Sequence, residues 1–365
     1  MMQWLKKYQL YIALFVLALG AGWGAYRYID STLQVPVPQV GVNVDEKQND
    51  MTDVVEPEQP IEVDEGDANK LRCPLDGAVL MDLTDKRPLA VMIDNSPAAR
   101  PPLGIDKADL VYEALVEGGI TRLMAVFYHD KAAEVGPIRS ARPYFVQLAQ
   151  DTKSVYVHAG QSPQAATMFK EKGIAHLNEI PITRGFWRVT DRVRPHNLLS
   201  STDKLHNLAE DYNLEKSIEV PAFPFYNKQP ELPETLRNSD EIIIYYPQQF
   251  SQVRYVYHED SGEYLRFMGE KAHIDGSNNL QLKARNIVVQ YVDTKVIDGE
   301  GRLEMNMTGK GKAMVFNNGI AYQARWEKDN LSSPTRYYTV KGEEIKFMPG
   351  QTWIQIVPTD TRVDY

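Results

Sequence analysis

The sequence is poor in the motifs that usually reveal a chemistry. It has a single cysteine, Cys73, so it can form neither an intramolecular disulfide nor a CxxC redox site. Its seven histidines show no HExxH or other close spacing of metal ligands, and there is no G-x-S-x-G nucleophile elbow and no phosphate-binding glycine loop. We therefore expect no bound metal and no cofactor, and motifs alone assign no catalytic residue.

Positive charge is outnumbered, since 40 lysines and arginines stand against 49 acids and the formal net charge is −9. Residues 30–70 hold eleven acids against two lysines, together with four prolines. A segment of this composition buries too little apolar surface to fold, so it is predicted to be a disordered acidic tether. Residues 71–365 are close to neutral, which gives no electrostatic footprint for binding nucleic acid.

Charge is absent altogether from residues 8–26, which follow Lys6 and Lys7 and carry aromatic residues at both ends. About 20 apolar residues span a hydrocarbon core and basic flanks stay cytoplasmic, so residues 1–29 are predicted to be an N-terminal membrane anchor with one transmembrane helix. The protein would then be a single-pass protein of the cell membrane, in contact with the bilayer through residues 8–29, with its C-terminal bulk extracytoplasmic. A cleavable signal peptide is the alternative, although the small residues near Gly20 fall inside the apolar stretch instead of after it.

The part of the chain before residue 221 mixes strand and helix patterns. Residues 89–93 and 123–128 are continuous apolar runs suited to strands covered on both faces, and Pro143 and Pro163 mark the first positions of helices. Residues 71–220 are therefore predicted to be a mixed α/β domain.

A proline-rich linker is predicted at residues 221–240, which hold four prolines among polar residues. After it the apolar pattern has a period of two, and Gly262 and Gly319 supply turn residues for tight hairpins. Residues 241–365 are predicted to be a mostly antiparallel β domain. The expected fold class is thus α+β, with two domains preceded by one transmembrane helix.

Arginine is concentrated in two segments, residues 136–143 and residues 184–197. The first stands directly before a predicted helix, whose first turn has unpaired N–H groups that favour anions. Guanidinium groups make bidentate bonds to carboxylate or phosphate, so the two segments predict a site for an anionic group if they converge. The predicted binding residues of these segments are Arg139, Ser140, Arg142, Arg192, Arg194, His196 and Asn197. The alternative is that the arginines pair with internal carboxylates such as Asp94, Asp109, Glu113 and Glu117.

Three further polar residues fall at the carboxyl ends of predicted strands, where open α/β sheets gather their ligands. They are Asp94, Asn95 and His158, which we add to the candidate binding residues. His158 or His196 could act as a general base, with Asp94 orienting the imidazole. A histidine at a strand end is more often a capping or packing residue.

Cys73 begins the segment Cys73-Pro74-Leu75-Asp76-Gly77, which looks like one half of a zinc knuckle. Since the chain has no partner cysteines, a structural turn is the simpler interpretation.

Six segments form a recognisable set: RPLAVMIDN at 87–95, ADLVYE at 108–113, EGGITR at 117–122, GPIRSARP at 136–143, RPHNL at 194–198 and the stretch from GQTWI at 350–354 through residue 358. Together they resemble the YerB family of bacterial surface lipoproteins. The resemblance covers roughly residues 73–365 and implies a two-domain α+β protein with a layered β-β-α sandwich, outside the membrane of a Gram-positive-type bacterium. It implies no activity. Family members commonly carry a lipidated cysteine, which this chain would replace with its membrane anchor.

The sequence therefore favours an extracytoplasmic cell-envelope protein that binds an anionic wall polymer or an envelope protein through its arginines, rather than an enzyme. A hydrolase or transferase acting on wall polymer is one alternative, with Asp94, His158 or His196 as acid or base. A protein-docking scaffold is another, and an exposed apolar patch would indicate it.

Overall fold

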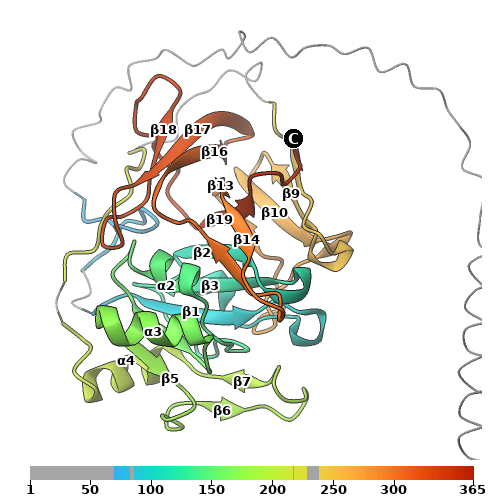
Figure 1. Cartoon of the computed structure of the whole chain (residues 1–365). Coiled ribbons are helices and arrows are strands. Elements are labelled where there is room, and N and C mark those ends of the chain that lie inside the picture. Colours follow the sequence, from blue (N-terminus) through green and yellow to red (C-terminus); the bar gives the residue numbers. More distant parts are fainter. Residues whose placement is uncertain (1–69, 83–85, 217, 228–237) are drawn as a thin grey trace, which may run out of the picture. The chain divides into compact units, whose positions relative to one another are not determined.

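Strands form most of the regular structure (Figure 1). The computed structural model describes residues 70–82, 86–216, 218–227 and 238–365, all within one compact unit, Glu58–Tyr365. Its largest element is a mixed sheet of ten strands. In the order in which they lie side by side, these are β18 (Arg336–Thr339), β17 (Ile320–Lys328), β16 (Gly309–Asn317), β13 (Asn286–Val292), β19 (Thr352–Pro358), β2 (Leu110–Leu115), β3 (Thr121–Phe127), β1 (Leu89–Asp94), β4 (Val155–His158) and β5 (His176–Asn178).

A second sheet is built from the chain after residue 240. Its strands are β11 (Lys271–Ala272), β10 (Glu263–Met268), β9 (Val253–His258), β8 (Glu241–Ile244) and β20 (Val363–Asp364), with β12 (Lys283–Ala284) paired to β10. Two ribbons pair β14 (Thr294–Val296) with β15 (Leu303–Met305) and β6 (Trp187–Arg188) with β7 (Leu198–Leu199).

The described residues include three short α-helices, which Figure 1 shows beside β1 and β5. They are α2 (Pro143–Ala149), α3 (Pro163–Lys172) and α4 (Thr202–Asp211). Helix α3 begins where the Ser162 side chain accepts a hydrogen bond from the N–H of Ala165, and it ends at Gly173, which has a φ of 61°. Single turns of 3-10 helix occur at η1 (Pro97–Ala99), η2 (Ile105–Lys107), η3 (Glu117–Gly119) and η5 (Gln249–Ser251).

Strand β19 joins the two halves of the sequence into one sheet. It lies parallel to both β13 and β2, so Ile354 is opposite Val288 on one side and Tyr112 on the other. Six of its seven residues are buried, as expected for a continuous apolar strand covered on both faces. The sheet is thus continuous across the predicted linker, while the predicted domain boundaries stay a prediction.

A buried ion pair links the two large sheets. Arg266 of β10 donates from Nη2 to Glu113 Oε2 of β2 at 2.6 Å, and both side chains are fully buried. Arg266 Nε also donates to His273 Nδ1 at 3.0 Å, and its guanidinium lies 4.2 Å from the centre of a Trp353 ring. Arg266 Nη1 donates to the Tyr255 hydroxyl of β9, so the partners of this buried cation come from both large sheets.

The predicted α+β class is wrong, because the described fold is mostly β. The helices span only seven, ten and ten residues, and strands from the C-terminal half extend the sheet that the N-terminal half begins. The apolar runs at 89–93 and 123–128 do form strands, β1 and β3. Strand β2 was missed because Glu113 interrupts its apolar pattern, and burial of that carboxylate depends on Arg266 and Asn95, which local patterns do not reveal as its partners.

No helix in the described part of the chain is both long enough and apolar enough to span a bilayer. The transmembrane helix included in the predicted fold class is therefore no part of the described structure. The predicted anchor, residues 1–29, lies outside the described residues, as does the predicted tether at 30–70 apart from Lys70.

Breaking the buried pair from either side should destabilise the fold strongly. We expect Glu113→Gln or Arg266→Met alone to lower the free energy of unfolding by about 3–5 kcal/mol. Each substitution removes one charge of the pair and leaves the opposite charge buried without its partner. The double variant should recover part of that loss. Urea unfolding of the purified protein measures all three, with Glu304→Gln at the exposed Lys295–Glu304 pair as a control that should change little. Single variants as stable as the control would contradict the role of the pair.

Candidate functional site: an arginine-lined pocket

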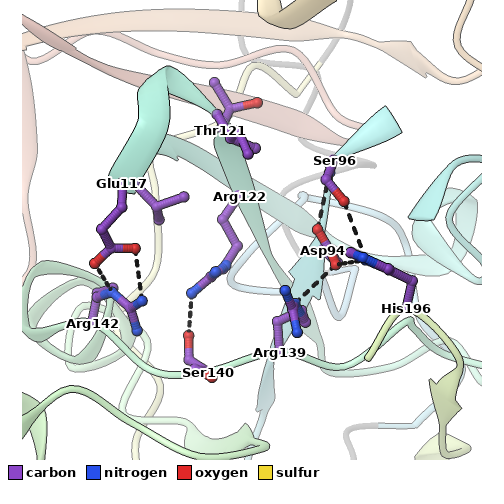
Figure 2. A pocket seen from close by; sticks show the side chains of 11 residues that line it. Asp94, Ser96, Glu117, Thr121, Arg122, Arg139, Ser140, Arg142 and His196 are labelled. Atoms are coloured by element: carbon purple, nitrogen blue, oxygen red, sulfur yellow. Dashed lines mark hydrogen bonds and ion pairs between the residues drawn. The ribbon is translucent and has the colours of Figure 1, made fainter. Parts of the chain in front are cut away.

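A pocket of about 290 Å³ opens where β1 ends and β3 begins (Figure 2). Asp94, the last residue of β1, is paired in register with Arg122 of β3. The segment after β3 passes beside β1 again, where the N–H of Arg139 donates to the Met92 carbonyl at 2.9 Å. We call this the arginine pocket. Its lining residues are Asp94, Ser96, Val116, Glu117, Ile120, Thr121, Arg122, Arg139, Ser140, Arg142 and His196.

Asp94 is the hub of one side of the arginine pocket. Its Oδ2 lies 2.8 Å from Arg139 Nε and 2.7 Å from His196 Nδ1, and its Oδ1 accepts a hydrogen bond from the N–H of Ser96. Burial alone would raise the pKa of Asp94, but Arg139, the Ser96 N–H and His196 together lower it. Asp94 is therefore an anion in the folded protein, and it is fully compensated by its neighbours.

A second ion pair forms the opposite side of the pocket. Arg142 donates from Nε and Nη2 to the two carboxylate oxygens of Glu117, at 2.6 and 2.7 Å. This is the bidentate geometry that guanidinium and carboxylate favour. Although burial acts to raise the pKa of Glu117, the Arg142 guanidinium lowers it.

Arg122 lies between these two groups and has no carboxylate of its own (Figure 2). The hydrogen bond found for its side chain in the described residues runs from Nη1 to the Ser140 carbonyl, at 2.6 Å. Only 7% of the residue is exposed. Burial, and next the like charge of Arg142, lower the pKa of Arg122 to about 10, so it stays cationic at neutral pH.

The pocket therefore carries uncompensated positive charge. Three guanidinium groups face two carboxylates, so Arg122 shares Asp94 and Glu117, which already pair with Arg139 and Arg142. A buried cation without a carboxylate of its own is costly, and an anion entering from solvent would reduce that cost.

The structure brings five of the ten predicted residues together. These are Asp94, Arg139, Ser140, Arg142 and His196, all of which line the arginine pocket. The two arginine-rich segments therefore converge. Two of the ion pairs expected from the alternative interpretation are also present, Asp94–Arg139 and Glu117–Arg142.

The other five predicted residues do not line this pocket. Asn95 points to the buried polar cluster between the sheets, where its Nδ2 donates to Glu113 at 3.1 Å and to Thr121 at 2.8 Å. Arg192 donates to the Ala99 carbonyl at 2.8 Å. Arg194 is exposed, and Asn197 is bonded to Arg188 and to the Val189 carbonyl.

His158 is buried elsewhere in the sheet. Its Nδ1 lies 2.8 Å from the Gly160 carbonyl, its Nε2 lies 2.9 Å from His176 Nδ1, and its ring stacks on Phe169 with centroids 4.9 Å apart. It does not meet Asp94 in the arginine pocket. These contacts are those of a packing residue.

Sequence reasoning missed Arg122, Glu117 and Ser96 as pocket residues. Arg122 carried a usable signal, because a charged residue opens an otherwise apolar buried strand. The helix predicted to begin at Pro143 is present as α2, but it has only seven residues. The helix is short, so the charge of the guanidinium groups makes the stronger case for an anion.

The chemistry available to the pocket is limited by the position of His196. Ser96 Oγ lies 3.3 Å from the same nitrogen, Nδ1, that contacts Asp94. In a serine nucleophile arrangement the hydroxyl and the carboxylate bind opposite nitrogens of the imidazole. Ser96 is thus not set up as an activated nucleophile, while Nε2 of His196 has no hydrogen bond in the described part of the chain and could bind a ligand.

The buried His158 should make stability fall in mild acid. Burial lowers its pKa to about 4 from an ordinary value of 6.5, so the unfolded chain binds a proton between these values and the folded chain does not. We expect stability to be full above about pH 6.5 and to fall by about 3 kcal/mol as the pH drops to 4. His158→Gln should flatten this pH dependence in urea unfolding, whereas His258→Gln at an exposed site should not. If the stability of His158→Gln depends on pH as strongly as that of the wild type, His158 is not the source of the pH dependence.

Comparison with known proteins agrees with the resemblance seen in the sequence. Residues 77–215 match the family model described as "Protein of unknown function (DUF3048) N-terminal domain", and residues 242–354 match its C-terminal counterpart. "Putative lipoprotein YerB" of Bacillus subtilis (strain 168) is 33% identical over 298 residues, which cover 80% of this chain and 87% of that protein. The crystal structure of the YerB protein from Bacillus subtilis superposes with a TM-score of 0.72 at 31% identity, covering 81% of this chain and all of the other. The chain therefore belongs to the YerB-like family of DUF3048 proteins, whose function is unknown.

Proposed function

We propose that this chain is an extracytoplasmic protein of the bacterial cell envelope that binds an anionic group of a wall polymer or envelope partner in the arginine pocket. The observation that carries the proposal is Arg122, a buried cation without a carboxylate partner among the described residues. Arg139 and Arg142 already have their carboxylates, so a ligand is needed to balance Arg122 alone.

The size and lining of the pocket favour a small anionic group. About 290 Å³ is at the lower end of the roughly 300–1,000 Å³ typical of small-molecule pockets, which suits one phosphate or carboxylate with its nearest substituent. A neighbouring pocket of about 260 Å³ shares Arg139 and Ser140 with it and is also lined by Glu179 and Arg188. Two adjoining pockets suit a repeating polymer better than an isolated ion.

The envelope location is supported by the relative's description as a lipoprotein, which is a membrane-attached class of protein. In this chain we propose that residues 8–29 contact the membrane, because they carry no charge apart from Arg27. A chain held there would present the arginine pocket to the anionic wall polymers outside the membrane.

Substitution of Arg122 tests the proposal directly. Charge-assisted hydrogen bonds contribute roughly 1.5–3 kcal/mol, so Arg122→Gln should weaken the binding of a phosphate or carboxylate ligand by about 10- to 150-fold. The free protein should be no less stable, because the substitution removes an uncompensated buried charge. Isothermal titration calorimetry with glycerol phosphate, inorganic phosphate and a peptidoglycan fragment measures the affinity, and urea unfolding measures the stability.

Arg184→Gln is the matched control. It removes the same unit of charge from an exposed arginine that is already paired with Asp211, outside the arginine pocket. Binding by this variant should equal that of the wild type. If the wild type binds none of the three probes, or if Arg122→Gln binds as well as Arg184→Gln, the pocket is not an anion site.

One observation favours a second function, hydrolysis or group transfer on an anionic wall polymer. Asp94 holds Nδ1 of His196 at 2.7 Å, which orients the imidazole as a general base while the arginines would fix the substrate. If this function is correct, His196→Gln should abolish turnover of a glycerol phosphate polymer and leave affinity within about threefold of the wild type. If the wild type binds the polymer without turning it over, the second function is wrong and the binding function stands by itself. The docking-scaffold alternative stays a prediction.

A further inference from the structure

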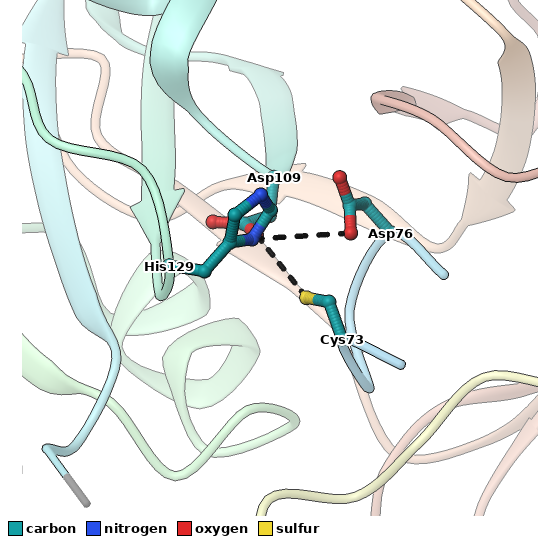
Figure 3. Close-up of side chains that lie close together, drawn as sticks. All are labelled: Cys73, Asp76, Asp109 and His129. Atoms are coloured by element: carbon teal, nitrogen blue, oxygen red, sulfur yellow. Dashed lines mark hydrogen bonds and ion pairs between the residues drawn. The ribbon is translucent and has the colours of Figure 1, made fainter. Parts of the chain in front are cut away.

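Four potential metal ligands meet at a place distinct from the arginine pocket (Figure 3). Cys73 and Asp76 come from a tight turn, Asp109 stands directly before β2, and His129 lies two residues beyond the end of β3. Their sulfur, oxygen and nitrogen donor atoms all lie within 4.8 Å of one another. The segment that resembled half of a zinc knuckle is thus completed by an aspartate and a histidine from the large sheet instead of by cysteines.

The backbone holds three of these side chains in fixed orientations. The N–H of Leu75 donates to Cys73 Sγ at 3.4 Å, and the N–H of Ala78 donates to Asp76 Oδ1 at 3.0 Å. Asp109 Oδ2 accepts from the N–H of Tyr128 at 2.7 Å, which leaves Oδ1 directed at the cluster. Outer hydrogen bonds of this kind orient the ligands of metal sites and are part of their construction.

The cluster is compact enough for one small metal ion, although its spacing is uneven. Donor atoms of a tetrahedral zinc site lie about 3.3–3.5 Å apart, given metal–ligand distances of about 2.0–2.3 Å. Cys73 Sγ is 3.3 Å from Asp109 Oδ1, which matches this spacing. His129 Nδ1 is nearer to Asp109 Oδ1, at 2.5 Å, and farther from Asp76 Oδ1, at 4.0 Å, so an ion would bind all four only after His129 shifts away from Asp109.

His129 Nδ1 points into the cluster without an aligned hydrogen bond. The atom is buried, and despite its short distance to Asp109 it has no hydrogen-bond partner of acceptable geometry among the described residues. The close approach of His129 Nδ1 to Asp109 Oδ1 is an ion-pair contact, and a metal ion would replace it by binding both atoms. The His129 side chain is 19% exposed, so an ion has a path into the cluster.

The electrostatics of the cluster also favour a cation. Two carboxylates, those of Asp76 and Asp109, meet one imidazole and one thiol in the cluster. A divalent ion would balance both, and it would also stabilise the deprotonated form of the buried Cys73.

We propose that Cys73, Asp76, Asp109 and His129 bind one zinc ion. The donor set of one thiolate, one imidazole and two carboxylates suits Zn²⁺ better than Mg²⁺ or Ca²⁺, because these two ions select oxygen donors. Four protein ligands close a tetrahedral site, so the ion is structural. It would fasten the turn that begins at Cys73 to the strands β2 and β3.

Metal titration of the full-length, tag-free protein after treatment with a chelator tests the proposal. We expect one equivalent of Co²⁺ to bind with the absorption bands of tetrahedral cobalt and a thiolate-to-cobalt charge-transfer band. One equivalent of Zn²⁺ should displace it and raise the Tm. Cys73→Ser should lose the charge-transfer band, and Asp109→Asn and His129→Gln should each weaken binding at least about tenfold.

Two controls keep the result interpretable. The serine of Cys73→Ser can still donate a hydrogen bond to Asp109, so this variant should stay folded, which circular dichroism verifies. Asp203→Asn removes an exposed carboxylate outside the cluster and should bind metal like the wild type. The site does not exist if the wild type binds no stoichiometric Co²⁺, if the bound Co²⁺ shows no thiolate band, or if all three ligand variants bind as tightly as Asp203→Asn.

Discussion

The buried pair between Glu113 and Arg266 is the interaction on which the rest of the structure depends. It fixes the six-stranded sheet against the ten-stranded one, and the carboxylate that accepts from Arg266 also accepts from Asn95 at 3.1 Å. Asn95 in turn donates to Thr121 at 2.8 Å. Because Asn95 and Thr121 are the sequence neighbours of Asp94 and Arg122, the buried pair positions the two strand ends that meet in the arginine pocket. The geometry of the arginine pocket therefore depends on the packing between the two sheets.

Within the pocket, paired and unpaired charges have different consequences. Asp94 with Arg139 and Glu117 with Arg142 are internally balanced, so they give the walls a fixed shape whether or not a ligand is present. Arg122 is held by the Ser140 carbonyl, a neutral acceptor that leaves its charge uncompensated. A site built in this way is preorganised, since a ligand has no internal ion pair to break before it binds.

The sequence predicts the local features of this protein better than its long-range ones. Apolar runs located β1 and β3, and the ends of strands and the arginine-rich segments identified Asp94, Arg139, Arg142 and His196. Local patterns could not reveal that β19 pairs with β2, because Ile354 and Tyr112 are brought together only by the completed sheet. For the same reason the carboxylate of Asp109 and the imidazole of His129 were not recognised as partners of Cys73. Arg122 was missed because a pattern cannot tell whether a buried guanidinium has a counter-ion.

The uncompensated charge on Arg122 is tested most directly by crystals of the protein grown with selenate, whose anomalous scattering locates the anion without ambiguity. We expect selenate in the arginine pocket, with an oxygen atom accepting hydrogen bonds from the Arg122 guanidinium, while the Asp94–Arg139 and Glu117–Arg142 pairs stay intact. A pocket without selenate, in which a carboxylate of the chain itself has moved to pair with Arg122, would contradict the proposed anion site.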